Sequence, residues 1–391
     1  MRRTTAFVVA FLASVVAVSA HHGVGTFELA KTVSFPVAKL TKVEFINPHS
    51  WLYFETADAS GKVQKHRCEM RSAHVLRRSG WSADMFRGGQ QVSITASPDR
   101  ADVASCYLQT IEFANGTRMD RYGQYVKAGT GIKEVRGAVK EVATVKREPR
   151  RPTGEPNLAG DWAPEQMVMA DPRGTGGGLV PLSTIATTQP GRTGGAAAGG
   201  GRRGGGAPAG PRLYGGTELT ELGTKEAAAA TQPDNPRFKC QTTSILFDWT
   251  FDGPVNRITQ TRDTITLQYG QMDLKRTVHM NLKAHPATVK PSRAGHSIGR
   301  WDGDVLVVDT VGFLPGFITF PVRHSDKLHV VERFSLDPKT NILTRSYTAD
   351  DPVYLKGQYT GQDRIGIADA PFTSDNCKEQ GFIDYSKQVN R

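Results

Sequence analysis

The chain has 391 residues, a formal net charge of +11 and four cysteines. This length allows two or three domains. Apart from an apolar stretch at its start, no segment is apolar enough to cross a membrane as a helix, so the mature protein is expected to be soluble, with no transmembrane segment.

Residues 1–20 (MRRTTAFVVAFLASVVAVSA) have the pattern of a secretory signal peptide. Two arginines are followed by an apolar stretch over Ala6–Val18, and the small residues Val18 and Ala20 stand at the −3 and −1 positions. The apolar stretch is too short to span roughly 30 Å of hydrocarbon. The sequence therefore predicts cleavage before His21 and a periplasmic or secreted protein of bacterial type.

The predicted export determines how the four cysteines are interpreted. An even number of cysteines in an oxidising compartment favours disulfides over metal ligation, and no CxxC motif is present. Two cysteines lie in the N-terminal half and two bracket the C-terminal half, which suggests the pairs Cys68–Cys106 and Cys240–Cys377. Four cysteines nevertheless allow three pairings.

Most of the positive charge lies in residues 21–150, where 20 Lys and Arg stand against 13 Asp and Glu. A basic surface of this kind can serve nucleic acid, anionic lipid or cell-wall polymers. After export, nucleic acid is not expected as a partner. A solvated surface without a partner is the alternative.

Residues 21–150 are expected to form a small basic domain. Five segments alternate between apolar and polar residues, and one short helix-like segment, Ser72–Arg78, follows the third of them. The five segments are Val33–Phe45, Trp51–Thr56, Val63–Glu69, Gln91–Ala96 and Tyr107–Phe113. Three strands, a helix and two strands is the order of an OB-type barrel.

Residues 151–212 are expected to be a linker. Half of residues 191–210 are glycine, and such a stretch cannot bury enough apolar surface to offset its conformational entropy. We therefore expect disorder from about residue 173. The RGG-like Arg202 and Arg203 are interpreted as part of a spacer rather than as an RNA-binding element.

Residues 213–391 are expected to form a larger domain, with one helix at Leu219–Ala230. Short alternating segments then follow with short connections, which favours an antiparallel meander or barrel. Such a barrel often encloses a small apolar ligand. The expected strands are Arg257–Gln260, Ile265–Tyr269, Lys275–Met280, Ser297–Trp301, Val305–Val311, Leu328–Phe334 and Ile342–Tyr347. The expected fold class is thus mainly β, with an OB-like barrel and a larger barrel-like domain.

Residues 21–120 resemble a family of short exported bacterial domains of unknown function. The features that carry this resemblance are the His21-His22 start, Asn47-Pro48-His49, Cys68-Glu69-Met70, Arg78–Trp81 (RSGW) and Gly88-Gly89.

Residues 235–360 resemble a second uncharacterised family of exported bacterial proteins. The matching stretches are Gly295–Trp301 (GHSIGRW), Gly303-Asp304, Val307–Phe313 (VVDTVGF), His324-Ser325, Leu328-His329, Glu332–Phe334 (ERF) and Asp351-Pro352. The chain departs from this family over Phe317–Val322, where a Trp-Leu-Asp run would be expected. Neither resemblance implies an established activity.

The first candidate site is a metal site at the new N-terminus. Cleavage after Ala20 gives His21 a free amine beside its imidazole, and His22 adds a second imidazole. These nitrogen donors suit copper(II), which has the highest affinity in the divalent series, or another divalent metal. His49 is the expected further ligand, with His66 or His74 as alternatives. An exposed, frayed terminus without metal is the competing interpretation.

The second candidate is a serine hydrolase site. Gly295–Gly299 has the G-x-S-x-G form, and Asp309 and then His324 or His329 follow Ser297 in the order of an α/β-hydrolase. That chemistry requires a serine on a strand-to-helix elbow. Here another strand is expected after the motif, and the span is too short for the intervening units of that fold.

The third candidate is a polar cluster in the C-terminal domain, with His296, His324, His329, Glu332 and Arg333 as the expected ligand-binding residues. His279, Asp309 and Asp351 belong to the same cluster. Glu332 alternates with apolar residues and is expected to be buried beside an arginine such as Arg300 or Arg345. A ligand pocket and a buried ion pair that only holds the barrel are both compatible with this pattern.

These features favour noncatalytic binding of a small molecule or metal ion in the periplasm. The alternative is an extracytoplasmic hydrolase that uses the histidine and carboxylate cluster. The identity of the ligand and the oligomeric state are not encoded in any pattern of this sequence.

Overall fold

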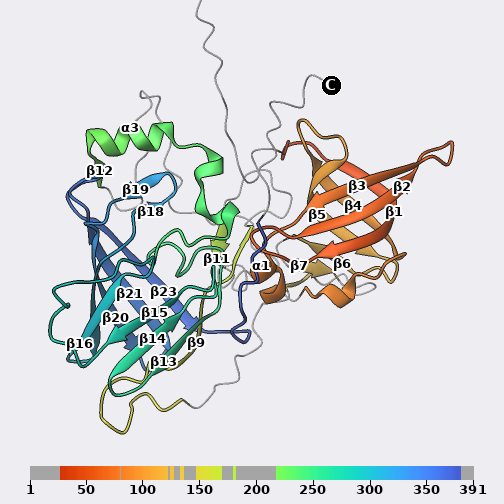
Figure 1. The fold of residues 1–391 in the computed structure, drawn as a ribbon. Coiled ribbons are helices and arrows are strands. Elements are labelled where there is room, and N and C mark those ends of the chain that lie inside the picture. Colours follow the sequence, from red (N-terminus) through yellow and green to blue (C-terminus); the bar gives the residue numbers. More distant parts are fainter. Residues whose placement is uncertain are drawn as a thin grey trace, which may run out of the picture.

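The computed structural model describes residues 27–79, 81–121, 124–126, 133–135, 147–169, 179–181 and 217–379. The expected signal peptide, with His21 and His22, and the Gly-rich part of the expected linker lie outside these residues. Two β-barrels lie side by side, one from each half of the chain (Figure 1). Within the described ranges, no helix has the length and apolar character needed to span a bilayer.

The N-terminal barrel confirms the expected OB-like fold. Strand β1 pairs with β2 and β4, β2 with β3, β4 with β5, and β5 closes the barrel by a parallel pairing with β3. The barrel strands are β1 (Val33–Glu44), β2 (Trp51–Ala57), β3 (Val63–Glu69), β4 (Gln91–Pro98) and β5 (Ser105–Phe113). Helix α1 (Ala73–Arg78) and the 3₁₀ helix η2 (Ala83–Met85) lie between β3 and β4, and β6 (Arg118–Asp120), β7 (Gln124–Val126) and β8 (Lys133–Val135) extend the sheet.

Alternation along the strands places the apolar side chains inside this barrel. Leu52 and Phe54 of β2 are buried, whereas Trp51 and Tyr53, which alternate with them, are only partly buried. Leu52 lies opposite Cys68, and Cys68 lies opposite Cys106 across the parallel pair that closes the barrel. Cys68 and Cys106 form a disulfide at this position, as expected.

The C-terminal domain is a closed barrel of nine strands, which confirms the expected fold class. All neighbouring strands of this barrel run antiparallel except β15 and β16, which are parallel and therefore need the crossing connection 280–295. In order around the barrel the strands are β13 (Asn256–Gln260), β14 (Thr264–Gln268), β15 (Lys275–His279), β16 (His296–Asp302), β17 (Val305–Val311), β20 (His329–Asp337), β21 (Ile342–Asp350), β23 (Tyr359–Ile367) and β9 (Gly160–Pro164).

Strand β9 differs from the expectation, because it lies inside the segment 151–212 that was assigned to the linker. It pairs with both β13 and β23 and so closes the barrel. Trp162 of this strand is fully buried in the barrel core. The barrel therefore recruits a strand from the far side of the Gly-rich segment, which the local composition of residues 151–212 does not indicate.

Smaller elements complete the C-terminal domain. Helix α3 (Glu221–Ala229) begins where Thr220 caps it by accepting a hydrogen bond from the backbone N–H of Gly223 (3.0 Å). The remaining elements are β10 (Met167–Met169) with β11 (Leu179–Pro181), β12 (Glu218–Leu219) with β22 (Leu355–Lys356), β18 (Gly316–Thr319) with β19 (Val322–His324), α3 (Glu221–Ala229), η3 (Gln232–Asp234) and η4 (Pro236–Lys239).

A buried carboxylate organises the interior of the C-terminal barrel. Glu332 of β20 is fully buried and forms ion pairs with two buried arginines, Arg276 of β15 and Arg345 of β21. Burial by itself would lower the pKa of Arg276, but the charge of Glu332 opposes this and raises the pKa above its ordinary value. The expected burial of Glu332 and its expected contact with Arg345 are thus present, whereas Arg300 is exposed.

The other N–H groups of the two arginines donate hydrogen bonds to further groups of the C-terminal domain. Arg276 donates to the hydroxyls of Ser297 (2.9 Å) and Thr310 (3.0 Å). Arg345 donates to the carbonyls of Ile245 (2.9 Å) and Leu246 (2.8 Å), and it also pairs with Asp363 of β23. These polar groups and the surrounding apolar side chains occupy the interior where a small apolar ligand was expected.

The two barrels are joined through the C-terminal segment after β23. The buried side chain of Asp375 accepts hydrogen bonds from Asn47 and from His74 (2.9 Å) of the N-terminal barrel. It also accepts a hydrogen bond from the backbone N–H of Met272. The disulfide between Cys240 and Cys377, the second expected pair, fastens this segment to the C-terminal domain.

Close to this junction, Asp248 is a buried acid without a full set of partners. One carboxylate oxygen accepts a hydrogen bond from the backbone N–H of Thr243 (2.8 Å), and the other has no hydrogen-bond partner. Burial raises the pKa of Asp248 to about 7, despite the hydrogen bond from Thr243 and the nearby charge of Arg237.

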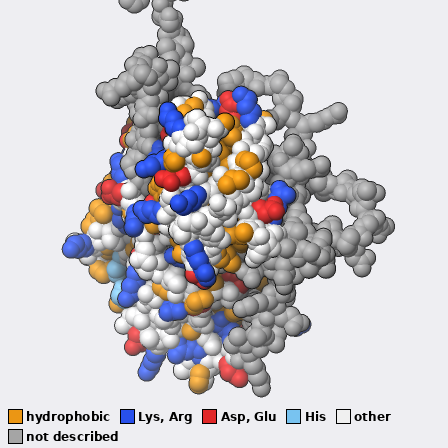
Figure 2. Space-filling view, turned by 90° about the vertical axis from the view of Figure 1, so that its right-hand side faces the viewer, with side chains coloured by type: hydrophobic (Ala, Val, Ile, Leu, Met, Phe, Trp, Pro, Cys, Tyr) orange, Lys and Arg blue, Asp and Glu red, His pale blue; other side chains and the backbone are white. Residues whose placement is uncertain are grey.

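Charged side chains are interspersed on the side of the molecule formed by the N-terminal barrel. Figure 2 shows lysines and arginines on this face separated by uncharged and acidic side chains rather than gathered into one continuous patch. On the described part of the face seen in this view, positive charge is therefore spread among other side chains.

Replacing Glu332 by glutamine is expected to destabilise the C-terminal barrel. The change leaves two guanidinium groups buried without the opposing charge, and removing one partner of a buried pair costs about 3–5 kcal/mol. Urea unfolding followed by tryptophan fluorescence measures the loss. Asp302→Asn, which breaks the exposed Arg333–Asp302 pair on the same barrel, should leave the unfolding midpoint unchanged. Equal midpoints for the two variants would contradict this role of Glu332.

The stability of the protein should fall as the pH rises through the pKa of Asp248. In the unfolded chain this carboxyl group ionises with its ordinary pKa of about 3.8, whereas in the folded chain its pKa of about 7 keeps it protonated to about pH 7. Its contribution is fully present below pH 4 and is lost at about 1.4 kcal/mol per pH unit up to about pH 7. Asp248→Asn should remove this decline in urea unfolding between pH 5 and pH 8. Asp263→Asn, at an exposed turn, should retain it.

Candidate functional site

Four histidines and one aspartate gather on the outside of the C-terminal barrel. Inward-facing and outward-facing residues alternate along each strand, so Ser297 and Thr310 point inward while their neighbours His296 and Asp309 point outward. His279 stands at the end of β15 and His329 at the start of β20. We call these residues, together with His285 from the crossing connection, the histidine cluster.

Short contacts link the members of the histidine cluster in a chain. The Nδ1 atoms of His285 and His296 are 2.9 Å apart, and Nε2 of His285 is 3.0 Å from Oδ1 of Asp309. Nε2 of His329 is also 3.0 Å from the same oxygen of Asp309. The ring of His279 stacks on His296 with 5.1 Å between centroids.

These contacts are consistent with neutral imidazoles. Asp309 can accept from Nε2–H of both His285 and His329, which leaves Nδ1 of His285 to accept from Nδ1–H of His296. Burial lowers the pKa of His296, and positive charge on His279 or His285 would lower it further. Neutral imidazole is the form that ligates metal ions.

The cluster is open to solvent but is not arranged around an ion as it stands. The side chains of His285, Asp309 and His329 are 19%, 40% and 42% exposed. Within the part of the chain that the structure describes, no group of three or more His, Cys, Asp or Glu residues is positioned to hold a metal ion. An ion could enter only if at least one imidazole of the cluster turned toward it.

Ser297 does not lie on a nucleophile elbow. It is fully buried on strand β16, where its hydroxyl accepts from Arg276 and contacts Thr310 at 2.9 Å. Asp309 and His329 lie on the opposite, outer side of the barrel wall, so Ser297 cannot form a triad with them. The G-x-S-x-G pattern is therefore a strand segment, and the hydrolase alternative based on Ser297 is not supported.

Of the other expected ligand-binding residues, none joins the histidine cluster. His324 is buried near the end of β19, and its Nδ1 contacts the carbonyl of Ser325 at 2.9 Å. Burial lowers the pKa of His324. Asp351 is buried and accepts from the backbone N–H of Ser325 (2.6 Å), so it holds a turn. Glu332 lies inside the barrel, and Arg333 pairs with Asp302 on the surface.

His49, His66 and His74, the expected further ligands of an N-terminal metal site, each contact a different partner. His49 pairs with Glu69, and Glu69 and burial act on it in opposite directions, with the net effect that its pKa is raised. His66 contacts the hydroxyl of Thr56 at 2.9 Å, and His74 pairs with Asp375. His21 and His22 lie outside the described residues.

His285 is the member of the histidine cluster that sequence reasoning missed. It lies in a loop without any regular pattern, 11 residues before His296. No sequence pattern marks this residue. In the structure, the parallel pairing of β15 and β16 makes the connection 280–295 return along the barrel to the start of β16, and His285 of this connection lies beside His296.

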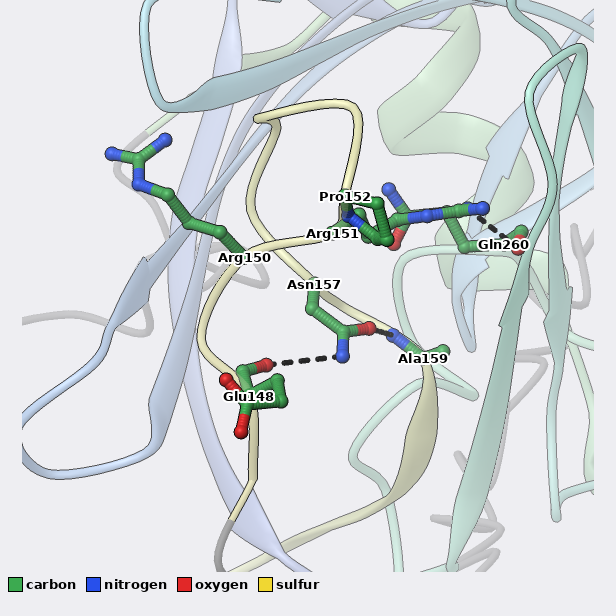
Figure 3. A pocket seen from close by; sticks show the side chains of 7 residues that line it. All are labelled: Glu148, Arg150, Arg151, Pro152, Asn157, Ala159 and Gln260. Atoms are coloured by element: carbon green, nitrogen blue, oxygen red, sulfur yellow. Dashed lines mark hydrogen bonds between the residues drawn. The ribbon is translucent and has the colours of Figure 1, made fainter.

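A surface pocket of about 440 Å³ lies where the chain enters the C-terminal barrel (Figure 3). Its cations already have partners, because Arg151 donates to the carbonyl of Gln260 (2.6 Å) and Arg150 pairs with Asp304. Figure 3 shows the side chain of Arg150 pointing away from the other lining residues. The arginines that line this pocket are therefore already paired, and the pocket has little free positive charge for a ligand.

Comparison with known proteins identifies one family. Residues 9–106 match the model of a family of unknown function (DUF6152), which covers most of the N-terminal barrel and agrees with the first resemblance noted in the sequence. No curated protein matches the chain. No solved structure matches it either. The resemblance of residues 235–360 to a second family remains a prediction.

Proposed function

We propose that this protein is an exported, noncatalytic binding protein whose histidine cluster takes up a divalent transition-metal ion. The observation that carries the proposal is the meeting of four imidazoles and one carboxylate on one solvent-accessible patch of the C-terminal barrel.

The distances between the side chains of the histidine cluster are close to those between the ligands of a metal ion, so an ion could replace the hydrogen bonds that now link them. Zinc binds imidazole nitrogen at about 2.0–2.1 Å, so two ligands of a tetrahedral site stand about 3.3 Å apart. The contacts of His285 and His329 with Asp309 are 3.0 Å, only a few tenths of an ångström shorter. His285 lies in a connection rather than in a strand, so its ring can turn. It would then join Asp309 and His329 as the third ligand of the ion.

The donor types indicate the class of metal. Imidazole suits zinc, copper and nickel, and one carboxylate is compatible with each of them. Copper(II) has the highest affinity of the divalent series for such a site. The separate candidate at His21 and His22 would use an amine as well, so the two sites must be tested independently.

Two features support a location outside the cytoplasm. The sequence begins with a predicted signal peptide, and the two disulfides are of a kind that persists in oxidising compartments. The position of Ser297 supports a role in binding rather than hydrolysis. Its side chain is enclosed in the barrel, and its hydroxyl accepts a hydrogen bond from Arg276.

Loss of one cluster ligand should abolish tight metal binding. Calorimetric titration of zinc(II) and copper(II) into the full mature protein is expected to show one ion in the cluster. Changes outside the first shell of ligands already weaken metal binding about 10- to 100-fold, so His285→Ala and Asp309→Asn should weaken it by at least about 100-fold. Affinity should also fall at acidic pH, because protons compete with the metal ion for the imidazoles.

Two controls make this result specific. Asp326→Asn replaces an exposed carboxylate on the same domain and should bind metal as the unmodified protein does. A chain that begins at Gly23 lacks His21 and His22 and should retain the ion in the cluster. If that shortened chain binds no metal while His285→Ala binds normally, the cluster is not the site.

Export should produce a chain that begins at His21. Mass spectrometry of the protein recovered from the osmotic-shock fraction of an expressing bacterium is expected to give the mass of residues 21–391 with two disulfides. Recovery of the chain from the cytoplasm with Met1 retained would contradict the export proposal, and it would do so independently of the metal titration.

A further inference from the structure

A second cavity lies between the two barrels, and no residue of the histidine cluster lines it. It has a volume of about 460 Å³, within the range of about 300–1,000 Å³ that is usual for small-molecule sites. One wall comes from the α1 region of the N-terminal barrel, including Arg71 and Val75. The other comes from the C-terminal barrel, including Phe251, Asp252 and Arg364. Figure 1 places α1 on the side of its barrel that faces the other.

Arg78 holds the two walls at a fixed distance. Its side chain is only 7% exposed, and it reaches from α1 into the C-terminal domain. There it donates to Asp369 (2.8 Å) and to the carbonyls of Gly253 (2.9 Å) and Pro164 (2.8 Å). The cavity is therefore formed before any ligand enters, and Arg78 itself has few donors left for one.

Arg364 is the cation that remains available. It lies exposed on β23 and makes no side-chain hydrogen bond or ion pair with any residue the structure describes. Across the cavity, Arg71 faces Asp252 at 3.9 Å. Three arginines and two carboxylates line the cavity, which leaves one net positive charge. One negative charge on a ligand is thus favoured, and a second would meet Asp252 or Glu165.

The rest of the lining is mixed, with apolar Val75, Pro164 and Phe251 beside polar Ser79, Gln166 and Thr250. Val75 is almost completely buried. The ring of Phe251 stacks on Phe247 with 4.3 Å between centroids, and its orientation is fixed further by the guanidinium of Arg237, 4.0 Å from its centroid. Phe247 and Arg237 cover the two faces of this ring, so its edge, together with the aliphatic Val75, is what a ligand can contact. Such an apolar contact suits the body of an organic ligand better than a hydrated inorganic ion.

We propose that this cavity binds a small organic monoanion that carries an apolar or aromatic body. The acidic group of the ligand pairs with Arg364, and its body lies against Val75 and Phe251. Because the lining comes from both barrels, such a ligand contacts both and stabilises their association, since it binds only when they are docked.

The test uses 8-anilinonaphthalene-1-sulfonate, an aromatic monoanion whose fluorescence rises in an apolar site. The full mature protein is titrated in EDTA, so that the histidine cluster holds no metal. One probe is expected per chain, displaced by benzoate and at least about tenfold less effectively by the dianion phthalate. Arg364→Gln should weaken probe binding about tenfold, which is typical for the loss of one hydrogen bond to a charged group.

Arg300→Gln is the matched control, because Arg300 is also an exposed arginine on a strand of the same barrel. It should leave the affinity for the probe unchanged. Thermal unfolding of both variants is compared with that of the unmodified protein, because the probe also binds partly unfolded chains. Unchanged affinity in Arg364→Gln, or equal weakening in both variants, would overturn the proposal. Neither outcome bears on metal binding, which is measured by a separate titration.

Discussion

A single fully buried carboxylate, Glu332, sets the internal geometry of the C-terminal barrel. A charge in that position is tolerated only with close opposite charge and a full set of hydrogen bonds, and Arg276 and Arg345 supply both. Arg276 also engages Ser297 and Thr310, which determines which sides of β16 and β17 face inward. The residues that alternate with them must then face solvent, and these include the aspartate and one histidine of the histidine cluster.

Arg345, the second partner of Glu332, connects this ionic network to the segment of the barrel that lies at the domain junction. Arg345 donates to the carbonyls of Ile245 and Leu246, at the start of the turns that contain Asp248 and Phe251. That segment lines the cavity between the barrels and holds the buried acid whose pKa is raised. One ionic network inside the barrel therefore positions a cluster on its outer wall and a cavity at its edge, although neither contains Glu332.

Much of the local structure follows from sequence patterns, and much of the site does not. Alternation located the five strands of the N-terminal barrel to within about two residues, because an OB-like barrel buries one face of every strand. Strand β9 was missed, since it is separated from β13 by the Gly-rich segment and pairs with it only in the folded chain. Glu332 was grouped with His329, yet the two lie in different environments because alternate positions of β20 face opposite sides of the barrel wall. His324 was grouped with them too, but it lies on β19, which pairs with β18 outside the barrel.

The sequence by itself determined the mainly β composition and indicated the burial of Glu332, because both depend on local alternation. It suggested the two disulfide pairs among three possible pairings, and the structure decided between them. The sequence also carries the predicted signal peptide. Only the tertiary structure decided that Ser297 is enclosed, that His285 meets Asp309 and His296, and that Arg78 spans the two barrels. These contacts join residues through barrel closure and domain docking, and closure is a property of the whole sheet that no single segment encodes.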